Sequence, residues 1–204
     1  SDNARHWTSE SPPTCEQNWS HRDKPYEYLR LQADILDAIG GDIIVEIGSV
    51  RQSMNHDFDT INVQCCTDGH STYFWARTNK EVHTVDISNY ASILIGIKST
   101  YPDNFNAYVG DGIKFLEDFT KQIDLLFLDA WDVDVTDYDK NHLIAFEAAQ
   151  GKLADKHIIG IDDTDVHAGG KGRCLIPRLN ELGYTKITDG RQTIFTNFDL
   201  NSVS

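Results

Sequence analysis

Five short apolar segments of this sequence each end in a carboxylic acid or reach one within two residues. These acids are, in chain order, Glu46, Asp86, Asp111, Asp129 and the pair Asp162-Asp163. If the segments are parallel strands, their carboxyl ends meet at one edge of a sheet, where open α/β folds bind their ligands. A single acid there is equally well explained as the cap of the next helix, but that explanation is weaker for all of them together. The pattern predicts one ligand site built around carboxylates.

The spacing of the first two acids indicates the chemistry of the ligand. An acid about 20 residues beyond a glycine-rich first turn usually accepts hydrogen bonds from ribose hydroxyls. Here Glu46 and Asp86 lie 40 positions apart, and the polar stretch 51–68 accounts for the difference. Gly48 permits close approach of the backbone to a ligand, and Gly69 opens the helix that follows the insertion.

No GxGxxG motif is present, so the sequence argues against a cofactor that carries pyrophosphate, such as NAD. A ligand with ribose and adenine but no phosphate needs fewer glycines around it. The sequence therefore favours an adenosyl cofactor without phosphate groups.

Strands and helices that alternate along the chain must position these acids. We predict strands at 43–47, 82–86, 105–109, 123–129, 157–161, 185–188 and 193–196, and helices at 26–39, 71–78, 88–100, 113–119, 138–153 and 175–182. Such alternation predicts a parallel sheet, and no helix separates the last two strands, which should pair antiparallel. We therefore expect an α/β fold with a doubly wound, mostly parallel seven-stranded sheet, an antiparallel last strand and helices on both faces.

The composition limits the class of protein and its partners. The 204 residues suffice for one domain, which we place at 24–204 behind an irregular arm at 1–23. A net charge of −14 disfavours nucleic acid and anionic membranes as partners. The four cysteines form no CxxC pair, and no apolar run is long enough to cross a bilayer, so we expect a cytoplasmic protein. A homodimer is the assembly that we consider for it.

Several segments resemble the motifs of class I S-adenosylmethionine-dependent methyltransferases. The matching segments are Val45-Glu46-Ile47-Gly48-Ser49, Val82-His83-Thr84-Val85-Asp86, Gly110-Asp111-Gly112 and the stretch 123–132. The resemblance covers residues 26–195 and is strongest to a bacterial and phage-type branch with Asp-Ala-Trp-Asp at 129–132, Ile-Asp-Asp-Thr-Asp at 161–165, Gly-Lys-Gly at 170–172 and Asp-Gly-Arg-Gln-Thr at 189–193.

The resemblance implies S-adenosylmethionine as the cofactor. In that family Asp86 would bind the ribose hydroxyls, Asp111 the adenine amino group, and Asp129 the amino group or reacting end of the cofactor. The inserted loop departs from the family pattern around Gly69, Ser71 and Thr72, which we include because they open the following helix. The full set of predicted cofactor residues is Glu46, Gly48, Ser49, Gly69, Ser71, Thr72, Asp86, Ile87, Asp111, Gly112, Asp129 and Trp131.

Metal-dependent O-methyltransferases of this class hold Mg²⁺ or Ca²⁺ with acids after the fourth and fifth strands. Asp129, Asp162 and Asp163 stand at those places, and hard oxygen ligands suit either ion. The alternative is that 162–165 is a capped turn with solvated charges. As catalytic candidates we take Asp129, His142, His167 and Lys171, although each histidine also has an ordinary structural explanation.

These inferences converge on an S-adenosylmethionine-dependent methyltransferase that acts on a small molecule, in the first place an O-methyltransferase; whether Mg²⁺ or Ca²⁺ assists it is an alternative that the sequence leaves open. One alternative is a binding module that keeps the cofactor pocket without catalysis. The other is an oxidoreductase with a nucleotide cofactor, against which the missing glycines and the reversed last strand argue.

Overall fold

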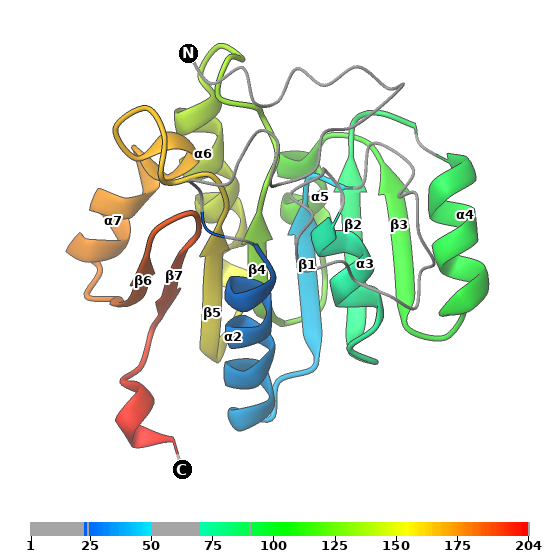
Figure 1. Cartoon of the computed structure of the whole chain (residues 1–204), viewed down its shortest axis with the longest axis horizontal. Helices are drawn as coiled ribbons and strands as arrows, with labels where there is room; N and C mark the ends of the chain where they lie inside the picture. Colours follow the sequence, from blue (N-terminus) through cyan, green and yellow to red (C-terminus); the bar gives the residue numbers. More distant parts are fainter. Residues whose placement is uncertain (1–22, 24, 50–69, 90, 204) are drawn as a thin grey trace.

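A computed structural model describes residue 23 and residues 25–49, 70–89 and 91–203 of the chain. Within this part, one seven-stranded sheet carries the fold, with helices on both of its faces (Figure 1). The strands are β1 (Ile43–Ile47), β2 (Glu81–Asp86), β3 (Phe105–Val109), β4 (Ile123–Leu128), β5 (Leu153–Ile161), β6 (Thr185–Asp189) and β7 (Thr193–Thr196). The α-helices are α2 (Pro25–Ala38), α3 (His70–Ala76), α4 (Ala91–Thr100), α5 (Gly112–Asp118), α6 (Tyr138–Ala149) and α7 (Leu175–Glu181).

The strand order β3-β2-β1-β4-β5-β7-β6 is that of a doubly wound sheet. Neighbours from β3 to β5 pair parallel, whereas β7 pairs antiparallel with both β5 and β6. The predicted fold class is therefore confirmed, including the reversed last strand. The order changes direction next to β1, so the carboxyl ends of β1 and β4 flank the place where a ligand is expected.

The boundary between the helix predicted at 138–153 and the strand predicted at 157–161 was wrong. The helix α6 ends at Ala149 and a 3-10 turn at Gln150–Lys152 follows, so β5 begins at Leu153 and not at 157. Gly151 in that turn is a poor helix former. The first residues of β5 are partly or fully exposed, so they lack the apolar pattern by which the rest of the strand was found.

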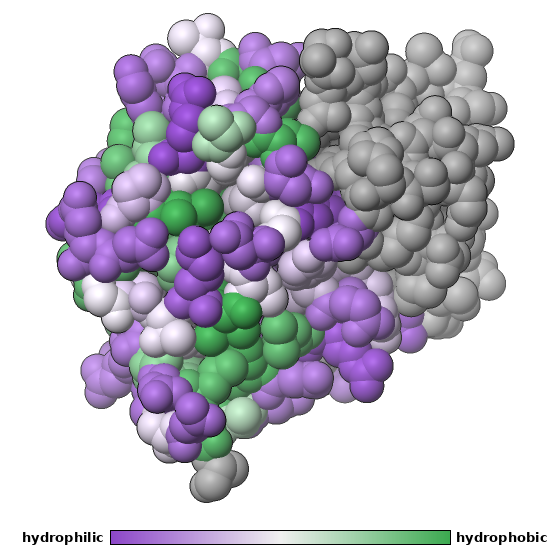
Figure 2. Space-filling model, turned by 60° about the vertical axis from the view of Figure 1, so that its left-hand side comes forward, coloured by the Kyte–Doolittle hydropathy of each residue, from purple (hydrophilic) through white to green (hydrophobic). Residues whose placement is uncertain are grey.

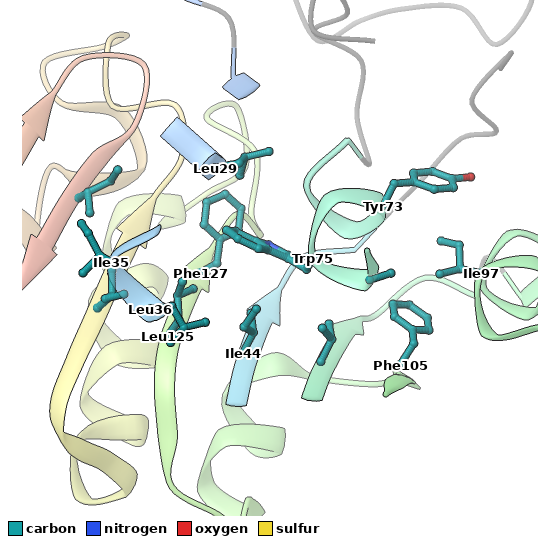
Figure 3. Packing of buried hydrophobic residues seen from close by; sticks show 14 of the residues in the cluster. Leu29, Ile35, Leu36, Ile44, Tyr73, Trp75, Ile97, Phe105, Leu125 and Phe127 are labelled. Atoms are coloured by element: carbon teal, nitrogen blue, oxygen red, sulfur yellow. The ribbon is translucent and has the colours of Figure 1, made fainter. Parts of the chain in front are cut away.

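Alternating side chains divide the core between the two faces of the sheet. In β1, Ile44 packs towards α2, α3 and α4, whereas Val45 and Ile47 pack towards α5, α6 and α7. Figure 3 shows the first cluster, in which Trp75 of α3 meets the ring of Phe127 edge-on at a centroid distance of 5.5 Å. The sheet whose strand ends carry the predicted acids is therefore packed against a helix layer on each face.

Hydrogen bonds continue past the strand ends and fix the loops that follow. The amide of Gly48 donates to Val85 (2.8 Å), that of Asp129 to Ile47 (2.8 Å) and that of Asp162 to Leu128 (3.1 Å). The first residue of each loop is therefore held in register with the neighbouring strand.

The surface seen in Figure 2 is dominated by hydrophilic residues, with hydrophobic ones gathered in smaller areas between them. In the described part of the chain, no helix combines the length and apolar character needed to span a membrane. The predicted arm, apart from its last residue, and the insertion at 51–68 lie outside the described residues.

Candidate active site

A cavity of about 370 Å³ lies at the carboxyl ends of β1 to β4, within the size range of small-molecule sites. The described residues that line it are Ile47, Gly48, Val85, Asp86, Ile87, Ser88, Gly110, Asp111, Gly112, Asp129, Ala130, Trp131, Asp132 and Val135. Seven of the predicted cofactor residues are among them, namely Gly48, Asp86, Ile87, Asp111, Gly112, Asp129 and Trp131. Gly69 lies outside the described residues.

Asp86 is held in place by two backbone amides. Its Oδ2 accepts from Ser49 (3.0 Å) and its Oδ1 from Ser88 (3.0 Å). A carboxylate has about four acceptor positions, so two more remain for ligand donors such as the paired hydroxyls of a ribose. Ser49 therefore contributes through its backbone, and Ser88, which the sequence analysis missed, has the same role. The signal for Ser88 was its position two residues after an aspartate, where Asp side chains commonly bond the backbone.

Asp111 serves both as a helix cap and as part of the cavity. Its Oδ1 accepts from the amides of Ile113 (2.8 Å) and Lys114 (3.3 Å) at the start of α5. The next residue, Gly112, packs so closely on β1 that an added Cβ would lie 2.6 Å from a side-chain carbon of Ile47. The capping explanation therefore holds for this acid and is compatible with a place in the ligand site.

Glu46, Ser71 and Thr72 form a separate buried cluster and are not among the described residues that line the cavity. The Glu46 carboxylate accepts from Ser71 Oγ (2.7 Å), Thr72 Oγ1 (2.6 Å) and Thr84 Oγ1 (2.8 Å). Burial raises the pKa of Glu46 to about 7, against the opposing effect of the three hydroxyl donors. Through these hydrogen bonds Glu46 links β1 to β2 and to the start of α3.

The three predicted metal ligands do come together. One carboxylate oxygen each from Asp129, Asp162 and Asp163 lies within 4.8 Å of the others. The side chain of Lys171 lies among the same acids, with Nζ 2.5 Å from Asp129 Oδ1, 3.2 Å from Asp163 Oδ2 and 3.9 Å from Asp132 Oδ1. Oxygen donors suit a hard cation, but a lysine ammonium already meets two of the three carboxylates.

The loops after β4 and β5 each contain a non-glycine residue in the left-handed backbone region. Trp131 has φ +40° and Asp163 has φ +54°. Such conformations are strained and persist where the surrounding structure imposes them, often at ligand sites. Gly48, which follows β1, packs so tightly on the loop after β4 that an added Cβ would lie 2.2 Å from the carbonyl oxygen of Asp129.

The two predicted histidines differ in their surroundings. His142 is fully buried, with Nδ1 2.5 Å from the carbonyl oxygen of Tyr138 and its ring edge-on to Trp131 at 5.2 Å. Burial, reinforced by the charge of Lys171, lowers the pKa of His142 to about 3. The neutral ring of His142 thus packs against Trp131, which lines the cavity. His167 is exposed in a turn and does not line the cavity.

Several solved structures that are similar to this chain are methyltransferases, and the chain has the fold of the class I S-adenosylmethionine-dependent methyltransferases. The O-methyltransferase from Bacillus cereus, in complex with S-adenosylhomocysteine, matches with a TM-score of 0.56 and 17% identity over 83% of this chain and 80% of that one. TomG from Streptomyces achromogenes, an O-methyltransferase of tomaymycin synthesis in complex with S-adenosylmethionine, matches with a TM-score of 0.53 and 16% identity over 83% of this chain and 78% of that one.

A third neighbour contains a metal ion. The MycE methyltransferase of the mycinamycin biosynthetic pathway, in complex with Mg, S-adenosylhomocysteine and mycinamycin VI, matches with a TM-score of 0.55 and 12% identity. The match covers 83% of this chain and 48% of MycE, so the chain spans about half its length. At these identities the likeness concerns the fold. No protein family and no curated protein matches the sequence, and the phage-type branch stays a prediction.

Proposed function

We propose that this protein is an S-adenosylmethionine-dependent methyltransferase that transfers the methyl group to a hydroxyl of a small molecule. The observation that carries the proposal is the cavity at the sheet edge, where Asp86 and Asp111 project from the ends of neighbouring strands into one space. When bound there, the cofactor would supply a methyl group activated by a positively charged sulfur.

The charge of the cavity supports a cationic ligand. Among its described lining residues are the carboxylic acids Asp86, Asp111, Asp129 and Asp132, and none is a lysine or arginine. S-adenosylmethionine carries a sulfonium and an ammonium, which such a lining attracts, whereas a pyrophosphate would be repelled. The same observation disfavours the oxidoreductase alternative.

Each lining element has a distinct task in this proposal. Asp86, fixed by two amides, would hold the ribose hydroxyls, and Asp111 with Gly112 would lie along the adenine. Trp131 and Val135 would wall the side where the acceptor enters. Most of the rate would come from holding the acceptor oxygen in line with the methyl group.

A hydroxyl acceptor must also lose a proton. The described carboxylates at the expected reacting end are those of Asp129 and Asp132. Lys171 Nζ lies 2.5 Å from Asp129 Oδ1 and 3.9 Å from Asp132 Oδ1, so Asp132 is the better proton acceptor of the two. His142 is unsuited to this task, because its ring is fully buried and is not among the described residues that line the cavity. We therefore assign it the positioning of Trp131.

Calorimetry with S-adenosylhomocysteine tests the binding part of the proposal. We expect saturable binding by the unmodified chain, none of comparable strength with NAD, and at least a tenfold weaker affinity, about 1.4 kcal/mol, for Asp86→Ala. Asp155→Ala is the matched control, since Asp155 is exposed near the amino end of β5. Equal affinities for the two variants would refute the site.

Turnover separates an enzyme from a binding module. Release of S-adenosylhomocysteine is measured with a panel of hydroxylated acceptors. Cofactor binding together with acceptor-dependent release supports the methyltransferase. Binding without release from any acceptor in the panel would instead favour the module that has lost catalysis.

A further inference from the structure

We propose that the ammonium of Lys171 is a built-in cation that stands where a divalent metal ion would otherwise bind between Asp129, Asp162 and Asp163. Nζ lies 2.5 Å from Asp129 Oδ1 and 3.2 Å from Asp163 Oδ2, so it joins the acid after β4 to the acid pair after β5. These are the two loops from which a metal ion would draw its ligands.

The burial of Lys171 fits this role. Its side chain is 0% exposed, and a charged amine so far from water is stable only beside opposite charges. Asp163 is also fully buried, and Asp162 is nearly so. Asp162 also has Arg191 Nε at 4.0 Å. The ammonium of Lys171, in contrast, is paired with Asp129 and Asp163, so removing the lysine would leave these two carboxylates in need of another cation.

The backbone around Lys171 is shaped to deliver it. Lys171 is the middle residue of a 3-10 turn, Gly170–Gly172, whose first glycine has φ +52°. A Cβ on Gly170 would lie 1.8 Å from the carbonyl oxygen of Asp163, and one on Gly172 would lie 2.5 Å from the side chain of Ile176. Gly170 thus lets the turn press against the loop after β5, and Gly172 lets it pack on α7, which together bring the lysine into the cluster.

A metal ion and this ammonium would compete for the same oxygens. Mg²⁺ and Ca²⁺ bind carboxylate oxygens at about 2.0–2.6 Å. An ion on Asp129 Oδ1 would therefore lie within about 5 Å of Nζ, where like charges repel strongly in a buried site. The unmodified chain should not need a divalent ion at this position, and loss of the ammonium should create a site for one.

The test titrates Mn²⁺ and Ca²⁺ by calorimetry into the chelator-treated chain, with no methyl donor present. The inference concerns the acid cluster of the proposed active site, but this readout does not depend on methyl transfer. A chain that binds no cofactor can still pass the metal test, and the reverse also holds, so the two proposals fail separately.

We expect no saturable binding by the unmodified chain up to about 10 mM, and a Kd below about 1 mM, at least tenfold tighter, for Lys171→Ala. The double variant Lys171→Ala/Asp163→Asn should lose that gain at least tenfold. Lys114→Ala is the matched control, because its exposed ammonium pairs with Asp118 at the surface.

Several results would overturn the inference. These are saturable binding below about 1 mM by the unmodified chain, a folded Lys171→Ala chain without metal binding, and binding that persists in the double variant. If Lys171→Ala folds only when Ca²⁺ is added, the inference is supported, since the ion then replaces the ammonium. If it folds under neither condition, Lys171→Met is used. That variant keeps the volume but not the charge, and the inference expects its stability to fall far more than that of Lys114→Met.

Discussion

Replacing Glu46 by Gln should change how the stability of the protein depends on pH. The carboxyl is fully buried and accepts hydrogen bonds through Oε1 from Thr72 and Thr84, and through Oε2 from Ser71. A glutamine keeps the first oxygen as an acceptor and turns an amide towards Ser71, whose hydroxyl can accept. The variant therefore reproduces the protonated form of Glu46 and fits without a new cavity.

The sign and size of the effect follow from the pKa. Burial raises the pKa of Glu46 from its ordinary 4.5 to about 7 in the folded chain. Between these values the folded state binds the proton more tightly than the unfolded state, so stability falls as the pH rises through this window. At about 1.4 kcal/mol per pKa unit, the loss amounts to about 3 kcal/mol and is complete above pH 7.

The assay is urea unfolding of the unmodified chain and of Glu46→Gln at a series of pH values from 4.5 to 8. We expect the difference in free energy of unfolding between them to shift by about 3 kcal/mol in favour of the variant across this range. The control Glu181→Gln, at a side chain that is 67% exposed, should run parallel to the unmodified chain. If the free energy of unfolding of Glu46→Gln also runs parallel to that of the unmodified chain across this pH range, the pKa of Glu46 is not raised and the reasoning is refuted.

Other predictions concern His142 and Gly48. The pKa of His142 is lowered from 6.5 to about 3, so the folded state resists the proton and stability should fall as the pH drops below 6.5. His142→Asn, which keeps a donor towards Tyr138, should remove about 2 kcal/mol of that loss between pH 6.5 and 4.5, measured by urea unfolding, and an unchanged slope would contradict this. Gly48→Ala should lower the free energy of unfolding by at least about 2 kcal/mol, because φ is +96° and the Cβ would meet the backbone of Asp129. Gly151→Ala, with nothing within 4 Å of its Cβ, is the control, and equal stability of the two alanine variants would show that the contact is not as tight as described.

The trends of Glu46 and His142 oppose each other between pH 4.5 and 6.5. As the pH rises through that window, the folded chain loses stability at the first group and gains it at the second. The unmodified protein should therefore show little net change from this pair. Only the variants separate the two contributions, which is why each is compared with the unmodified chain at every pH.

Much of the fold could be predicted because its strands are short apolar runs bounded by turn residues. The strands at 43–47, 105–109 and 193–196 have the predicted bounds. The start of β5 could not be found in this way, because Leu153 pairs with Ile123 of β4 while the next residues are exposed. Where a strand is exposed and is held by its hydrogen bonds to a neighbouring strand, its own residues show no apolar pattern by which it could be predicted.

The sequence predicted where the site residues lie along the chain better than it predicted where their side chains point. The acids do stand at the strand ends, but β1 directs Glu46 and Ile47 to opposite faces, and only Ile47 reaches the cavity. Lys171 was a candidate, yet nothing in the sequence places its ammonium beside Asp129, 42 residues earlier. That contact depends on how a glycine turn meets the end of β5.

The strained loops after β4 and β5 bear on how the carboxylates at the cavity are held in position. Trp131 and Asp163 hold left-handed conformations, each of which costs about 1–2 kcal/mol in a non-glycine residue. Groups from elsewhere in the chain pack on both loops: Gly48, which follows β1, lies against the backbone of Asp129, and Lys171 pairs with Asp163. Because the folded core supplies the energy that keeps these loops in place, the carboxylates at the cavity are arranged before a ligand arrives. Binding then need not supply the free energy of assembling them, which leaves more of it for orienting the reacting groups.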